Sequence, residues 1–217
     1  MRTLKVQGKG EVSVTPDICK YSMLLTTKNC DYSSAYNVLN IAVDNFRERL
    51  VSIGISAEEI KTSDYSITAV TAYLREEGKY IPDGYQGTHR LSIKVPLDKE
   101  RMNTVFNVLA YGKGLDPSCK TSISISFGIS DPEAVKKQLL RNAVAVAKTN
   151  AETIADAAGI KLGQIASIEY GWSEVRFYNE LDYEANSCCE GPAPCPPDIQ
   201  PNDMSTTDTV TVIYEIL

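Results

Sequence analysis

The 217-residue sequence predicts an α+β fold, with antiparallel or mixed sheets packed against helices. Two observations carry this prediction. Apolar residues alternate with polar ones in some segments, as in half-buried strands, and recur every three or four residues in others, as in helices. From residue 18 to residue 129 these segments follow the order β-α-β-β-α-β of a ferredoxin-like unit. A long helix and C-terminal strands come after that unit.

The first two strands are expected at residues 3–14 and 18–28. In the first of them, Leu and Val alternate with polar residues, and Gly8 and Gly10 lie in the middle. Glycines inside a strand mark a bulge or a close approach of another backbone. We therefore expect something to pack tightly against Gly8 and Gly10.

Five more regions have strand patterns. Residues 60–72 and 80–95 are expected to pair through a connection near residues 76–79. Residues 122–129 alternate Ile or Phe with Ser or Gly, which predicts a strand with one buried face. The last strands begin after Leu162 and at Val210.

Two shorter helices precede the long one. The first is expected to begin at a cap provided by Asp31, Ser33 or Ser34 and to end at Gly54. The second opens at Asp98 and ends at Gly112 or Gly114.

The long helix is predicted from Ser130 and Glu133, which have the spacing of a capping box. Its buried stripe changes from Val and Leu to Ala and reaches Ala158, and Gly159 then ends the helix after roughly 28 residues. Small side chains allow another element to approach closely. We favour packing within the chain over a subunit contact.

An acidic segment separates the last two strands. No Lys or Arg follows Arg176, whereas eight acidic residues do, although the whole chain carries a formal charge of only −6. Residues 180–207 are rich in Pro, Asn, Asp and Ser, a composition that cannot build a core. We expect a flexible acidic loop here.

Three of the six cysteines, Cys188, Cys189 and Cys195, crowd into this loop. Three thiols beside acidic residues could bind a soft metal ion or form a disulfide. They lack a C-x-x-C spacing, and no nearby basic group would lower a thiol pKa. A structural role is therefore favoured, and a thiol or metal-binding module stays open as the alternative. Small, partly buried side chains are expected for the others, Cys19, Cys30 and Cys119.

No catalytic constellation is apparent. The single histidine, His89, has no Ser or Cys motif beside it and is expected to face solvent from a strand. Gly8 and Gly10 lack both the third glycine and the following helix of a dinucleotide loop. Paired carboxylates of a hydrolase or transferase cannot be recognised without geometry, so an enzyme of that kind remains an open alternative.

The expected partners follow from charge and hydropathy. An acidic chain without a basic cluster disfavours nucleic acid, and no apolar stretch reaches the length of a membrane span. No cofactor is expected. Four tyrosines around the second strand pair, Tyr65, Tyr73, Tyr80 and Tyr85, are explained equally well by a protein interface and by strand propensity.

Together these segments resemble the SIMPL-domain family, a bacterial family of unknown function that includes periplasmic immunogenic proteins. The resemblance covers nearly the whole chain. The matching residues are Gly8, Gly10, Val12, Val14, Pro16-Asp17, Ile53-Gly54-Ile55, Ile60 to Ser63, Tyr65-Ser66-Ile67, Gly84-Tyr85, Ile125-Ser126-Phe127, Ala143, Ala147-Lys148, Ala151, Ile154-Ala155, Ala158-Gly159 and Leu162-Gly163.

The resemblance implies one unit, 1–217, made of two intertwined subdomains, about 18–129 and 1–17 with 130–217. It also implies homo-oligomers and a link to stress tolerance, and it supplies no catalytic residues. We expect a non-enzymatic, self-associating scaffold or interaction protein. The first residues lack the apolar region of a secretory signal, so the sequence as written predicts a cytoplasmic protein, or a periplasmic or envelope protein if a leader has been removed.

Overall fold

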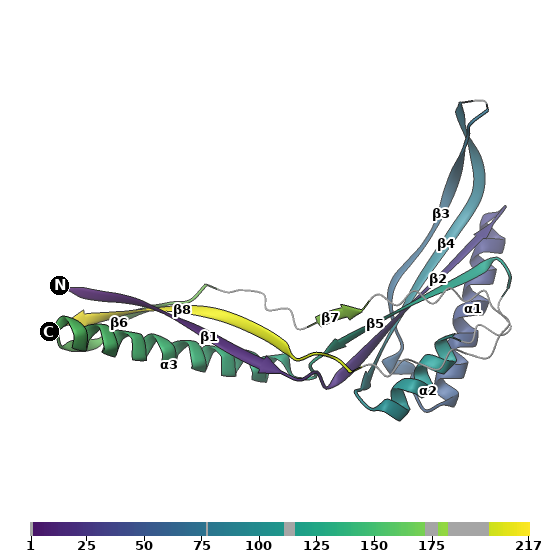
Figure 1. The fold of residues 1–217 in the computed structure, drawn as a ribbon. Coiled ribbons are helices and arrows are strands. Elements are labelled where there is room, and N and C mark those ends of the chain that lie inside the picture. Colours follow the sequence, from purple (N-terminus) through teal and green to yellow (C-terminus); the bar gives the residue numbers. More distant parts are fainter. Residues whose placement is uncertain (1, 77, 111–115, 172–177, 182–199) are drawn as a thin grey trace. The chain divides into compact units, whose positions relative to one another are not determined.

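The computed structural model describes the whole chain except residues 1, 77, 111–115, 172–177 and 182–199 (Figure 1). Helices pack on antiparallel sheets, which confirms the α+β class. The described elements, in chain order, are β1 (Thr3–Val14), β2 (Ile18–Asn29), α1 (Tyr32–Ser52), β3 (Lys61–Leu74), β4 (Lys79–Pro96), α2 (Lys99–Ala110), β5 (Cys119–Gly128), α3 (Pro132–Ala158), β6 (Leu162–Glu169), β7 (Tyr178–Leu181) and β8 (Met204–Ile216).

The chain forms two compact units, and each contains segments from distant parts of the sequence. The first unit consists of Met1–Pro16, Ile129–Tyr178 and Pro201–Leu217. The second consists of Asp17–Gly128 and Asn179–Gln200.

The second unit is built on a sheet with strand order β3-β4-β2-β5-β7. Strand β2 pairs antiparallel with β4 on one side and with β5 on the other. Both helices of this unit pack on the sheet, and α1 also contacts α2. Large apolar side chains fill the space between these layers. The bulkiest fully buried ones are Tyr21, Phe46, Phe106, Phe127, Met23, Leu25, Leu39, Leu50, Leu91, Ile93, Leu109 and Ile123.

Helix α1 begins where the sequence predicts. The Asp31 carboxylate accepts a hydrogen bond from the backbone N–H of Ser34 at 2.8 Å, and this bond satisfies one of the free donors of the first turn. At the other end Ile53 caps the helix, and Gly54 follows with a φ of 86°, a conformation that favours glycine.

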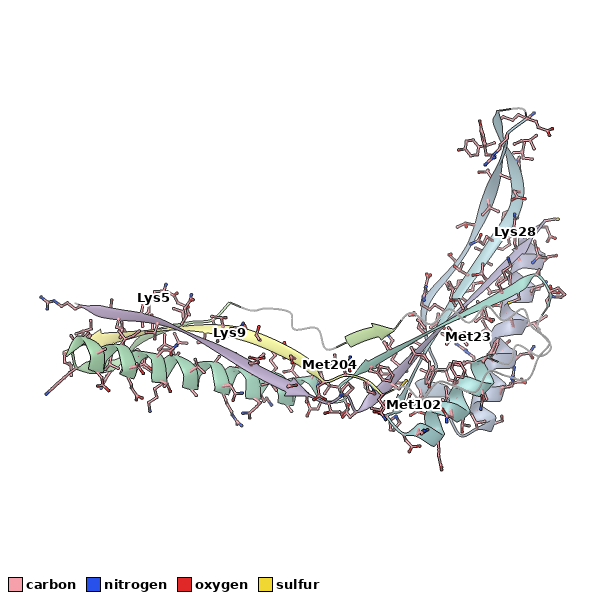
Figure 2. The ribbon with its side chains drawn as sticks, in the orientation of Figure 1. Lys5, Lys9, Met23, Lys28, Met102 and Met204 are labelled. Atoms are coloured by element: carbon pink, nitrogen blue, oxygen red, sulfur yellow. The ribbon has the colours of Figure 1, made fainter. Side chains whose placement is uncertain are left out.

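The first unit is built on a sheet with strand order β1-β8-β6, and α3 packs mainly on β1 and β8. The even-numbered residues of β1 face the helix, and its Lys residues lie on the opposite face, as Figure 2 shows for Lys5 and Lys9. A methyl group on Gly8 or Gly10 would lie closer than 3.0 Å to the backbone of α3. The predicted close approach at these glycines is confirmed, and the strand passes through it with no register shift.

The alanine stripe of α3 packs within the chain. Ala143, Ala147 and Ala151 are fully buried in a cluster that includes Val6 and Val212. This packing agrees with the preference for an intramolecular role. Gly159 ends the helix with a φ of 67°, as expected.

The predicted start of α3 needs a correction. The N-cap is Asp131, whose carboxylate accepts the backbone N–H of Ala134 at 2.9 Å, and not Ser130. Pro132 occupies the first helical turn, where its fixed φ suits the helix and its missing N–H costs nothing. The cap therefore lies one residue later than the capping-box spacing indicates.

The acidic loop also needs a correction at its ends. Residues 180 and 181 belong to β7, which joins the edge of the second unit's sheet beside β5, and β8 already begins at Met204. Ser205 and Thr207 are exposed and alternate with the more buried Met204, Thr206 and Asp208, so the strand pattern extends further back than the apolar residues reveal. Residues 182–199 lie outside the described part of the chain.

Candidate functional site

The hairpin formed by β3 and β4 carries exposed side chains along β3 and at its tip. Figure 1 shows it extending beyond the end of α1. Strand β3 lies at the edge of the sheet, and most of its side chains are exposed or only partly buried. The far part of the hairpin therefore exposes both faces, unlike the strands that α1 and α2 cover.

Tyrosines pair with one another along this hairpin. Near its tip, the rings of Tyr73 and Tyr80 lie 5.1 Å apart in a tilted arrangement, and the two residues are 54% and 72% exposed. Closer to the helix, Tyr85 contacts Tyr32 of α1 edge to face at 5.9 Å. Such pairs stabilise the hairpin and leave large amphipathic rings at the surface.

The base of the hairpin contains His89, and its position corrects the sequence interpretation. We expected a solvent-facing side chain, but His89 is 7% exposed. Strand parity is the reason: residue 89 shares its face with Leu91 and Ile93, which lie in the core. The alternation of apolar residues in β4 therefore already indicated that His89 faces the core.

The surroundings of His89 are polar on one side and aromatic on the other. Its Nε2 lies 2.9 Å from the Thr62 hydroxyl, which also accepts a hydrogen bond from Arg47 at 3.3 Å. The Tyr65 ring contacts the imidazole edge to face at 5.3 Å. Within the described residues, Nδ1 has no hydrogen-bond partner.

Burial lowers the pKa of His89, and the nearby Arg47 guanidinium lowers it further. Asp44 and Asp64 act in the opposite direction with smaller effects. The imidazole is therefore neutral at pH 7. It is held by Thr62 at the base of the hairpin.

The candidate thiol site cannot be located. Cys188, Cys189 and Cys195 lie outside the described residues. Within the described part of the chain, no group of three or more His, Cys, Asp or Glu side chains is arranged to hold a metal ion.

The other cysteines differ from one another. Cys19 is fully buried and Cys119 is partly buried, and burial raises the pKa of each thiol to about 11. Both agree with the expectation of small, buried side chains. Cys30 does not, because it is exposed just before α1, where the chain leaves the sheet.

The described surface includes two open depressions. One, of about 510 Å³, lies between β1 and α3 and is lined by Lys5, Gln7, Asn150 and other residues. The other, of about 260 Å³, lies where α1 ends and α2 begins, and Asp98 and Glu100 line it. The Asp98 carboxylate accepts the backbone N–H of Arg101 at 2.9 Å, so it caps α2.

Among the described residues, no helix has both the length and the apolar character that crossing a membrane requires.

Comparison with known proteins gives a family match along nearly the full length. Residues 4–214 match the family model SIMPL, described as "Protein of unknown function (DUF541)". The chain is 24% identical over 172 residues to the 26 kDa periplasmic immunogenic protein of Brucella melitensis biotype 1. The same figures hold for the protein of that name from Brucella abortus strain S19. In both, the match covers 76% of this chain and 65% of the relative, so the chain spans less than two thirds of their length.

Comparison with solved structures gives only weak similarities. A phage SAM lyase in complex with S-methyl-5'-thioadenosine is 11% identical over 49% of this chain and 79% of its own, with a TM-score of 0.26. The regulatory subunit of aspartate kinase from Thermus flavus is 10% identical over 94% of this chain and 86% of its own, with a TM-score of 0.15. Neither score supports an argument about fold or activity.

Proposed function

Because this chain belongs to the SIMPL family, whose function is unknown, we propose that it is a non-enzymatic protein that self-associates through the β3–β4 hairpin to act as a scaffold or interaction partner. The observation that carries the proposal is the exposure of Tyr73 and Tyr80 at the hairpin tip. Burial of large aromatic rings in an interface removes a large apolar area from water and costs little side-chain entropy, and such residues are enriched in interfaces.

The exposed surface of the hairpin supports this choice. Side chains of Val70, Ala72, Leu74 and Ile81 are only partly buried, although the last three belong to the paired part of the hairpin near its tip. When a second surface covers an exposed element with apolar side chains on both faces, apolar area is removed from water and the free energy of the system falls. A second copy of the chain is the partner that we propose.

The contact is expected to use the faces and tip of the hairpin rather than its edge. The register of β3 against β4 shifts between Thr62 and Asp64 and again between Ala69 and Thr71. Such irregularities interrupt the row of backbone groups that an added strand would need, and they protect an edge from strand addition.

The test is the solution mass from light scattering after size exclusion, for the native chain and for the double variant Tyr73→Ser, Tyr80→Ser. We expect a defined multimer for the native chain and at least tenfold weaker association for the variant. The control, Ile41→Ser with Val51→Ser, removes two exposed apolar side chains from α1 and should leave the mass unchanged.

Two outcomes would contradict the proposal. One is a native chain that stays monomeric at high concentration, and the other is an equal effect of both double variants. The measurement is repeated with reductant. A multimer that dissociates on reduction would instead favour a role for Cys188, Cys189 and Cys195.

We further propose a location in the periplasm or cell envelope, because the relatives named above are periplasmic proteins. No comparison supports the cytoplasmic expectation. Fractionation of cells that produce the protein tests the location.

We also propose a role in stress tolerance. Survival of a deletion strain under oxidant tests this role.

A further inference from the structure

The face of the second unit's sheet opposite His89 and Leu91 carries a row of hydroxyl groups. The strand registers place Lys61 of β3, Ser92 of β4, Ser22 of β2 and Ser124 of β5 beside one another. Residues that are directly opposite on paired strands point to the same side of the sheet. Three adjacent strands therefore present three serines side by side, and Lys61 stands at the end of the row.

Cations surround the serine at the centre of this arrangement. Arg90 and Lys94 lie two residues before and after Ser92 on the same strand, at about 6.8 Å along it, and Lys61 lies about 4.8 Å across. Lys20 lies directly opposite Lys94 on the neighbouring strand.

Two of these cations, Lys61 and Lys94, are only weakly compensated. Asp64, opposite Arg90, is the acidic residue of the same face nearest to them in register. Within the described residues, Lys61 and Lys94 form no ion pair, and both are exposed. Arg90 donates a hydrogen bond to the Ser22 hydroxyl at 3.3 Å, and this bond holds its guanidinium over the serine row.

We propose that this surface, made of Lys20, Ser22, Lys61, Arg90, Ser92 and Lys94, binds the phosphate groups of an anionic lipid surface. The shape of the face carries the choice of partner. The cations are spread in two dimensions over a sheet face, and neither depression described above involves them. One dissolved phosphate would find no enclosed site among these residues, whereas a planar array of phosphates meets several cations at once.

Other anionic partners fit less well. Single-stranded nucleic acid binds proteins by stacking its bases on aromatic rings, and the six residues of this surface include none. The two-pronged guanidinium of Arg matches carboxylates and phosphates alike, whereas Lys acts as a point charge, as it does in many phosphate sites. This surface has three Lys and one Arg. The hairpin tip is not part of this surface, so lipid binding does not depend on self-association. It rests on the proposed envelope location only because that location would bring the protein close to anionic lipids.

The test is co-sedimentation of the full chain with vesicles made of equal parts of phosphatidylglycerol and phosphatidylcholine, and with vesicles of phosphatidylcholine alone. We expect binding to the first and none to the second, and the binding should weaken as salt is added. The double variant Lys61→Gln, Lys94→Gln should partition about 30-fold more weakly, which is about 2 kcal/mol at 1.4 kcal/mol per tenfold.

The matched control is Lys9→Gln with Lys137→Gln, which changes the net charge equally at exposed positions of the first unit. It should keep nearly native binding, and circular dichroism should show all variants folded. Equal loss in both double variants would reduce the effect to net charge and overturn the proposal. Displacement from the vesicles by millimolar inorganic phosphate, or tighter binding to single-stranded DNA or polyglutamate than to vesicles, would overturn the lipid assignment.

Discussion

The two units bury their sheets against helices in opposite ways. In the second unit, aromatic and branched side chains such as Phe46, Phe106 and Phe127 fill a wide gap between the sheet and two helices. In the first unit, glycines of β1 meet alanines of α3, and the helix backbone comes nearly into contact with the strand.

This difference teaches that water can be excluded by filling a gap or by closing it. A filled gap is sensitive to the loss of atoms, because a cavity remains. A closed gap is sensitive to the addition of atoms, because backbone cannot move aside as a side chain can. The following variants break or sharpen this comparison, beginning with the largest expected effect.

Truncation should break the filled interface. Phe46→Ala removes a fully buried ring between α1 and the sheet, and we expect a loss of about 3 to 5 kcal/mol of unfolding free energy by urea denaturation. Phe46→Leu keeps much of the volume and should lose less than about 1.5 kcal/mol. If the two variants were equally stable, the packing of this ring would not matter.

Addition should break the closed interface. In Gly8→Ala, the new methyl group would meet the backbone of Ala143 and Ala147, and we expect a loss of about 3 kcal/mol. Gly171→Ala is the control in the same unit, because no described residue lies within 4 Å of its added Cβ, and it should be nearly neutral. A neutral Gly8→Ala would show that α3 can withdraw from β1 at little cost.

The buried histidine should make stability depend on pH. The folded-state pKa of His89 is lowered, so the unfolded chain binds the proton first as the pH falls below about 6.5. The contribution of His89 to stability is therefore complete above that pH and decreases below it, by at most about 1.4 kcal/mol per pH unit. Urea denaturation between pH 7 and 5 should show a steeper fall for the native chain than for His89→Gln.

The smallest effect concerns the edge of β1. Asn150 and Asn142 of α3 donate hydrogen bonds, each 3.0 Å long, to the carbonyl oxygens of Gln7 and Glu11. Eight residues of helix and four of strand both span about 12 to 13 Å, so the two spacings match. Helix side chains thus occupy edge carbonyls that would otherwise accept a foreign strand.

Replacing either asparagine by Ala should lower the free energy of unfolding by about 1 kcal/mol relative to the control Asn45→Ala. Asn45 is exposed on α1, so its replacement brings the same gain in helix propensity without the loss of such a hydrogen bond. Thermal denaturation by circular dichroism measures the difference. Equal melting temperatures for all three variants would show that these two bonds add nothing.

Much of the local structure follows from the sequence because its causes are local. Alternation in β1 and β5, the cap at Asp31 and the glycine ends of α1 and α3 each depend on residues within a few positions of one another. The position of His89 was equally local, and correct use of strand parity predicts it. The cap of α3 was missed because two residues that can cap a helix, Ser130 and Asp131, are adjacent. Pro132 favours the first helical position, which makes Asp131 the N-cap.

What the sequence by itself determined is the α+β class, the family, and the long strands and helices other than β7. Only the tertiary structure decided which strands pair, that α3 closes on Gly8 and Gly10, that β7 joins the sheet of the second unit, and that Lys61, Arg90 and Lys94 surround Ser92. The physical reason is sequence separation. Periodicity reports which side of an element is buried, whereas the partner that buries it, and the charges that meet across strands, depend on segments far apart in the chain.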